Sequence, residues 1–184
     1  MLKQAEAWEN DHDDQEAIKQ LLDLVRLSEA SGYWAVYAEA NLSLARLYEK
    51  LSLPDKCIVR LRMAQGAVKK YSLHTIYPKF AIRLSSYHRV FKNQLDSAKF
   101  YAMQAVKTVP KDTLIIHEGT AYLLLALIDF HSSPKTALRY YDKAGKVFKA
   151  LNDYTGYGYV LLGQSRIHLN QGRLKKRSLI TIPL

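Results

Sequence analysis

The sequence predicts an all-α fold from three observations: apolar residues at helical spacing, small residues at a fixed period, and prolines just before the periodic runs. Three pairs of small residues stand seven positions apart: Cys57 and Ala64, Ala98 and Ala105, and Ala137 and Ala144. Their final alanines recur with a period of about 40 residues, which is typical of helical solenoids. No segment alternates apolar and polar residues for long enough to predict a strand.

Eight helices are predicted in order, over residues 15–30, 33–52, 54–71, 78–92, 95–108, 117–131, 134–150 and 156–170. Helical spacing of apolar residues defines the first two and stops at the turn 52–55. The third, fourth and seventh begin at Pro54, Pro78 and Pro134, because the first helical turn tolerates a missing N–H group. The fifth carries the small pair that begins at Ala98.

The remaining two helices are predicted from an apolar run and from glycines. The sixth contains the longest apolar run of the chain, AYLLLALI, over residues 121–128. In the eighth, Gly156 and Gly158 open the helix and Gly163 permits close packing against a neighbour. Small residues bring helix axes to about 8–10 Å, and one hairpin cannot bury both of its apolar faces alone. The predicted fold is therefore a right-handed superhelical stack of about four antiparallel helix hairpins.

Three regions are predicted along the chain. Residues 1–14 form a polar segment, residues 15–172 form one helical repeat domain, and residues 173–184 form a basic, irregular tail. The basic run at residues 172–177 has two interpretations, a nuclear-targeting signal or a truncated second helix with a basic exposed face. The two remain open.

Composition favours an intracellular globular protein. Hydrophobic residues make up 48% of the chain, yet its longest apolar run is far shorter than the ~20 residues that span a bilayer. The N-terminus lacks the apolar core of a secretion signal, and a lone Cys57 fits a reducing compartment. The formal net charge is +10, and the excess of positive charge, which lies beyond Glu29, suits an acidic partner or nucleic acid. The positive charge is attributed to a solvated helix exterior rather than to nucleic-acid binding, because no nucleic-acid motif accompanies it.

The sequence predicts no enzyme, cofactor or metal site. Its six histidines are scattered over different predicted hairpins and lack metal-ligand spacing. GYGYVLLG, residues 156–163, superficially resembles a nucleotide loop, but its third glycine comes late and no strand precedes it. The sequence shows no Ser-His-Asp or Cys-His arrangement. The close carboxylates Asp11, Asp13 and Asp14 fall in a polar segment that is expected to fray or to cap a helix rather than to act in acid/base catalysis.

The frame of small and large residues resembles the tetratricopeptide repeat family over residues 33–172. The first hairpin matches the family spacing at Ala45, Tyr48, Cys57, Leu61 and Ala64. Cys57 replaces the usual alanine, and a serine replaces the usual turn glycine. The second repeat departs further from the pattern, and the third is clear only in its second helix. This resemblance implies a helical scaffold and says almost nothing about function.

A narrower resemblance covers residues 17–64, whose order of features is similar to the C-terminal repeats of the anaphase-promoting complex subunit 5 family. The similarity lies in four short segments: the pair Ala38-Glu39, LSLA at 42–45, the turn LPD at 53–55 and LRMA at 61–64. Near the end of the chain, YDKA at 141–144 and GQSRIH at 163–168 fit the last repeat of that family. The family consists of non-catalytic scaffold subunits of a ubiquitin ligase that controls the cell cycle. The resemblance implies a fragment or short form, protein subunits as partners, and a nuclear and cytoplasmic location.

Five residues are predicted to bind a partner protein: Arg46, Glu49, Arg83, Tyr87 and Tyr122. In a superhelix of hairpins the first helix of each pair lines the concave face, so these side chains are expected to project into one groove. Two arginines and two tyrosines there would suit an acidic, partly apolar segment. The alternative is a groove that stays empty, with contacts on outer helices such as the face bearing Lys69 and Lys70. An alternative function is a stand-alone adaptor, or the sensor arm of a bacterial regulator, that binds an acidic peptide.

Overall fold

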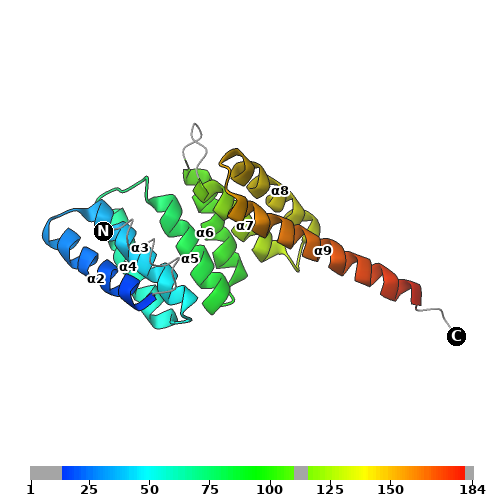
Figure 1. Cartoon of the computed structure of the whole chain (residues 1–184), viewed down its shortest axis with the longest axis horizontal. Coiled ribbons are helices and arrows are strands. Elements are labelled where there is room, and N and C mark those ends of the chain that lie inside the picture. The colour runs from blue at the N-terminus through cyan, green and yellow to red at the C-terminus, as the bar shows by residue number, and fades with distance from the viewer. Residues whose placement is uncertain (1–13, 110–115, 181–184) are drawn as a thin grey trace. The chain divides into compact units, whose positions relative to one another are not determined.

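The computed structural model describes residues 14–109 and 116–180, with side chains described as far as Gly172. Within these ranges the chain is built of α-helices and contains no strand, which confirms the predicted all-α class (Figure 1). The helices are α2 (Asp14–Ala30), α3 (Trp34–Lys50), α4 (Pro54–Lys70), α5 (Tyr77–Phe91), α6 (Leu95–Thr108), α7 (Ile116–Asp129), α8 (Pro134–Ala150) and α9 (Tyr154–Ile180). Apart from the end of α9, the predicted bounds agree within about two residues.

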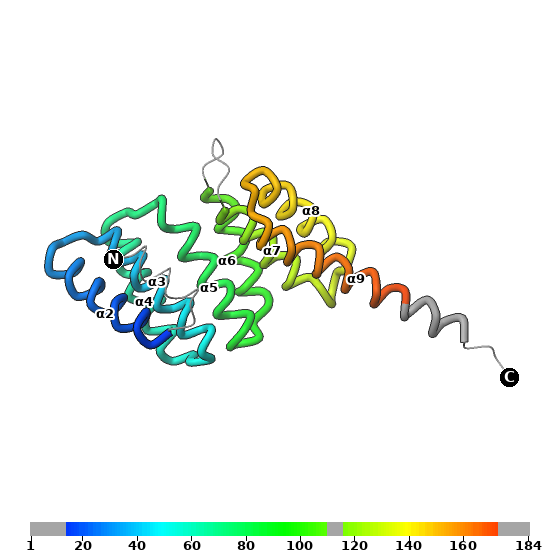
Figure 2. Tube along the Cα trace, viewed as in Figure 1, coloured from blue at the N-terminus to red at the C-terminus, as the bar shows by residue number. Residues whose placement is uncertain are grey.

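The chain divides into two compact units, whereas the sequence predicts one repeat domain over residues 15–172. Unit 1 (Met1–Thr108) contains α2 to α6, and unit 2 (Val109–Leu184) contains α7 to α9. In unit 1, α3 packs against α2, α4 and α5, while α5 also packs against α4 and α6. In unit 2, α8 packs against both α7 and α9, and α7 also contacts α9. Figure 2 traces the alternating direction of consecutive helices within each unit.

Five of the described turns between helices contain a residue with positive φ. A residue with positive φ follows the helix end at Gly32, Ser52, Ser72, Asn93 and Asn152. After α3, for example, the Leu53 N–H donates to the Tyr48 carbonyl at 2.8 Å and the Ser52 N–H donates to the Glu49 carbonyl at 3.0 Å. These bonds satisfy carbonyls at the helix end and reverse the chain. Pro54 and Pro134 then begin the next helices, as predicted.

Alanines occupy fully buried positions on two helices of unit 1, α4 and α6. Ala64 on α4 and the three buried alanines of α6, Ala98, Ala102 and Ala105, are fully buried. Leu42, Leu44 and Leu61 fill the surrounding core. Ser85 of α5 also donates to the Ala98 carbonyl at 2.7 Å, which ties the second hairpin together in its interior.

Enlarging either Ala64 or Ala105 to leucine is expected to lower the free energy of unfolding by about 1–3 kcal/mol, because the extra atoms overpack a helix contact. Chemical denaturation followed by circular dichroism measures the change. Gln65→Leu is the matched control, since Gln65 is the exposed neighbour of Ala64, and its effect should stay within about 0.5 kcal/mol. Unchanged stability in both alanine variants would mean that these residues do not form the closest contacts.

Helix α9 continues to Ile180, about ten residues beyond its predicted end. The predicted irregular tail over residues 173–184 is therefore wrong for residues 173–180, whose backbone is helical. Gly172 lies within this helix, because a glycine in a helix interior costs only about 1 kcal/mol relative to alanine. Residues 181–184 lie outside the described residues, as do residues 1–13 of the predicted polar segment; Asp14 is the first residue of α2.

Candidate functional site

Three of the predicted binding residues lie together where α3 contacts α5. A guanidinium nitrogen of Arg83 lies 3.9 Å from a carboxylate oxygen of Glu49, and their side chains are only 23% and 18% exposed. The hydroxyl of Ser86 donates a hydrogen bond to the same carboxylate. A second pair, Lys79 with Glu39 at 2.6 Å, joins the same two helices. The predicted charges are therefore partly used to join α3 to α5.

Electrostatics at this contact oppose the charged form of Arg83. Burial lowers the pKa of its guanidinium, Glu49 acts to raise that pKa, and the positive charge of Arg46 lowers it further. Arg83 thus needs Glu49 as a counter-charge. Arg46 is the exposed member of the group and has interactions of its own.

Tyr87 does not present its ring to solvent, as the sequence-based groove requires. Its side chain is only 4% exposed and its ring packs against Phe91, with ring centroids 5.6 Å apart. The ammonium group of Lys92 lies 5.8 Å from the centroid of the same ring. The reason is that α5 contacts three helices and buries residues around most of its circumference. Tyr87 is therefore a core residue.

Tyr122 lies on α7 in unit 2, whereas the other four predicted residues lie in unit 1. It is half-buried and stacks on Tyr140, with centroids 6.3 Å apart, while the Lys143 ammonium lies 5.2 Å from its ring centroid. Burial raises the pKa of the Tyr122 hydroxyl, and the nearby Glu118 raises it further. Tyr122 is thus held by neighbours within its own unit.

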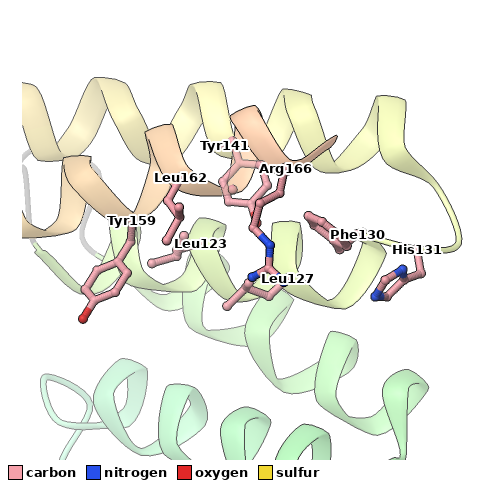
Figure 3. Close-up of a pocket in the computed structure, with 9 residues that line it drawn as sticks. Leu123, Leu127, Phe130, His131, Tyr141, Tyr159, Leu162 and Arg166 are labelled. Atoms are coloured by element: carbon pink, nitrogen blue, oxygen red, sulfur yellow. The ribbon is translucent and has the colours of Figure 1, made fainter. Parts of the chain in front are cut away.

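Unit 2 contains an open pocket of about 370 Å³ that the sequence analysis did not predict. It lies between α7 and α9, with Tyr141 of α8 also in its wall. The lining is mainly apolar and aromatic: Leu123, Leu127, Phe130, His131, Tyr141, Tyr159, Leu162, Gly163 and Arg166. Figure 3 shows Tyr159 and His131 at opposite ends, with Leu123, Leu162 and Arg166 between them. We call this the α7–α9 pocket.

The pocket depends on the register between α8 and α9. Gly163 faces Tyr141 so closely that a Cβ at this position would overlap the tyrosine ring. The predicted close packing at Gly163 is therefore confirmed, and it allows the aromatic ring of Tyr141 to fill the pocket wall. Arg166 reaches over Phe130, with the guanidinium carbon 5.8 Å from the ring centroid. This contact holds a cation at the edge of an apolar surface.

Chemically, the α7–α9 pocket is suited to binding. Leucine and aromatic side chains can receive a large apolar side chain, while Arg166 and His131 can face a carboxylate beside it. The described residues that line it include neither a carboxylate nor a cysteine. Cys57 lies in the core of unit 1, where burial, and secondarily Glu49, raises the pKa of its thiol to about 12. A thiol with this pKa is a poor nucleophile near neutral pH.

Two further findings concern metal binding and membrane-spanning helices. Among the described residues, no three His, Cys, Asp or Glu side chains gather in a way that could hold a metal ion. Over the same part of the chain, none of the helices combines the length and apolar character needed to cross a membrane.

Comparison with protein-family models finds no match to this sequence, and comparison with curated proteins finds no significant match. The resemblances described above therefore depend only on the residues that carry them. The pocket could have been suspected from Leu161 and Leu162, because neither lies at helical spacing with Gly163, the residue expected to pack closely.

Proposed function

We propose that this protein is a non-catalytic scaffold that binds other proteins, built from helix hairpins stacked as in a tetratricopeptide-like solenoid. The hairpins α3–α4, α5–α6 and α7–α8 and the contact between α3 and α5 support this proposal. In stacked repeats, the first helices of successive hairpins are neighbours. A right-handed superhelix over the whole chain is part of the proposal.

The α7–α9 pocket carries the proposal. Leu162 is 57% exposed beside Leu123 and Leu127, although leucine is one of the residues that folding usually buries. Exposed apolar side chains around a hollow, next to a guanidinium group, are typical of surfaces that accept an anchoring side chain from a partner.

The more specific form of the proposal is a subunit of the anaphase-promoting complex that resembles subunit 5. The residue pattern over 17–64 supports this form. Its partners would then be the other subunits of that ubiquitin ligase, and its location would be the nucleus and the cytoplasm. The alternative is a stand-alone adaptor for an acidic peptide. That alternative is supported by the charge of α9, whose 27 residues include no Asp or Glu.

Capture of partner proteins tests the proposal. We expect Leu127→Ser with Leu162→Ser to reduce capture from a cell extract at least about tenfold, because two apolar contacts are lost. The bound proteins are quantified by mass spectrometry after cross-linking. The melting temperature should change by no more than a few degrees, since both side chains are partly exposed.

Val59→Ser with Met63→Ser is the matched control, because these exposed apolar residues lie on α4 in unit 1. Equal capture by both double variants would exclude the α7–α9 pocket as the contact. Failure of the unaltered protein to capture any protein reproducibly would contradict the scaffold proposal itself.

A further inference from the structure

As far as Gly172, where the described side chains end, helix α9 is buried along one face only. Its buried positions, Gly156, Val160, Gly163 and Ile167, recur every three or four residues and face α8. The first helices of the hairpins in unit 1 differ, since α3 buries a nearly continuous run from Tyr37 to Tyr48. Because α3 is covered by helices on several sides, its apolar residues surround it.

The opposite face of α9 is nevertheless apolar. Leu161, Leu162 and Leu169 are 46%, 57% and 62% exposed, and the spacing of seven between Leu162 and Leu169 puts them on one side of the helix. Gly158 and Gly172 lie along the same side, and no atom lies within 4 Å of a Cβ built on either of them. Exposed leucines separated by small residues form a surface on which another helix can pack closely. We call this surface the open face of α9.

The charge of α9 indicates what covers the open face. The helix contains five basic residues and no acidic residue; the basic residues are Arg166, Arg173, Lys175, Lys176 and Arg177. Four of the five fall in its last eight positions. A second copy of this chain would add the same cations, whereas a partner helix with Asp or Glu would neutralise them.

We infer that the open face of α9 binds an acidic amphipathic helix of a partner protein, in the antiparallel direction. This inference rests on the proposed scaffold function and specifies the class of partner. Leucine-like side chains of the partner cover Leu161, Leu162 and Leu169, and one of them enters the α7–α9 pocket beside Leu162. The antiparallel direction puts the first turn of the partner helix near the basic end of α9. Acidic residues are also most favourable in a first turn, where they complement the helix dipole.

Two synthetic peptides test the inference with the complete protein. Each has about 20 residues, roughly 30 Å as a helix, with leucines at positions i, i+3 and i+7; one carries glutamates elsewhere and the other carries lysines. Fluorescence anisotropy should detect binding of the glutamate peptide, and binding of the lysine peptide at least about tenfold weaker. Affinity for the glutamate peptide should fall as salt is raised, because screening weakens charge attraction.

Leu161→Ser with Leu169→Ser should weaken binding of the glutamate peptide at least about tenfold, since two leucines that the peptide would cover are lost. Val59→Ser with Met63→Ser, on unit 1, should leave it unchanged. Equal binding of both peptides, no binding, or binding that survives the α9 double variant would each overturn the inference. If partners captured from an extract also survive that variant, the scaffold proposal stands and only the assignment to the open face fails.

A second copy on the open face would be detected with Ser165→Cys, because Ser165 is exposed midway between Leu161 and Leu169 and the native Cys57 is buried. We expect sedimentation as a monomer and no disulfide-linked dimer under mild oxidation. A dimer linked through residue 165 would overturn the assignment to an acidic partner.

Discussion

Replacing Gly163 by valine is expected to lower the free energy of unfolding of unit 2 by about 3 kcal/mol. Even a Cβ at this position would overlap the Tyr141 ring, which is itself fully buried in the core of the unit. The ring belongs to α8, packs against Gly163 of α9 and forms part of the wall of the α7–α9 pocket. Hydrogen exchange of the α8 and α9 amides measures the loss, because both tryptophans of the chain lie in unit 1.

Gly158→Val is the matched control on the same helix. No atom lies within 4 Å of a Cβ built at Gly158, so the same change should alter stability by less than about 1 kcal/mol. Similar protection in both variants would mean that the contact between Tyr141 and Gly163 does not hold α8 to α9. Loss of protection at Gly163 alone would confirm the register on which the α7–α9 pocket depends.

Helix positions could be predicted from the sequence because their signals are local. A proline at a helix start, a turn residue at a helix end and a seven-residue spacing of alanines act within one or two turns of the chain. Pro54, Pro134 and the turn at Ser52 therefore lie where the sequence predicts them. The predicted end of α9 at residue 170 was about ten residues too early, because nothing breaks the helix before Ile180.

The division into two units could not be predicted, because the periodic pattern continues through both of them. Residues within unit 1 and residues within unit 2 follow the same spacing of small side chains, and only the packing distinguishes them. A repeat pattern indicates which small and large side chains one hairpin requires. It does not indicate where one compact unit ends and the next begins.

At the candidate site, the sequence could not predict which side chains stay exposed and which are used in contacts between helices. The pattern placed Arg46, Glu49 and Arg83 on one groove, yet it could not tell an open groove from a contact between two helices, where the structure pairs Arg83 with Glu49. Tyr87 was expected to be exposed because the repeat rule gives α5 one outward face. The α7–α9 pocket was missed because its two halves, residues 123–131 and 159–166, become neighbours only through the packing of α7 on α9.

Replacing Glu49 by alanine is expected to lower the free energy of unfolding of unit 1 by about 2–3 kcal/mol. Loss of the carboxylate leaves the desolvated Arg83 beside the like charge of Arg46, and a charge that loses its counter-charge away from water is costly. The hydroxyl of Ser86 also loses its acceptor. Denaturation followed by the fluorescence of Trp34, which stacks on Tyr71 in the core of the same unit, measures the effect.

Two controls separate an interior pair from an exposed groove. Lys50→Ala breaks a pair with Asp14 in which the lysine is largely exposed, so it should cost no more than about 1 kcal/mol. Glu49→Ala combined with Arg83→Met should recover most of the loss, because the uncompensated charge is gone and an apolar side chain fills its place. Unchanged stability in Glu49→Ala, together with weaker capture of partner proteins, would instead restore the groove over α3 and α5 as the binding site. The pairing in the structure favours the first result, since a carboxylate that neutralises Arg83 is not free to recruit a partner.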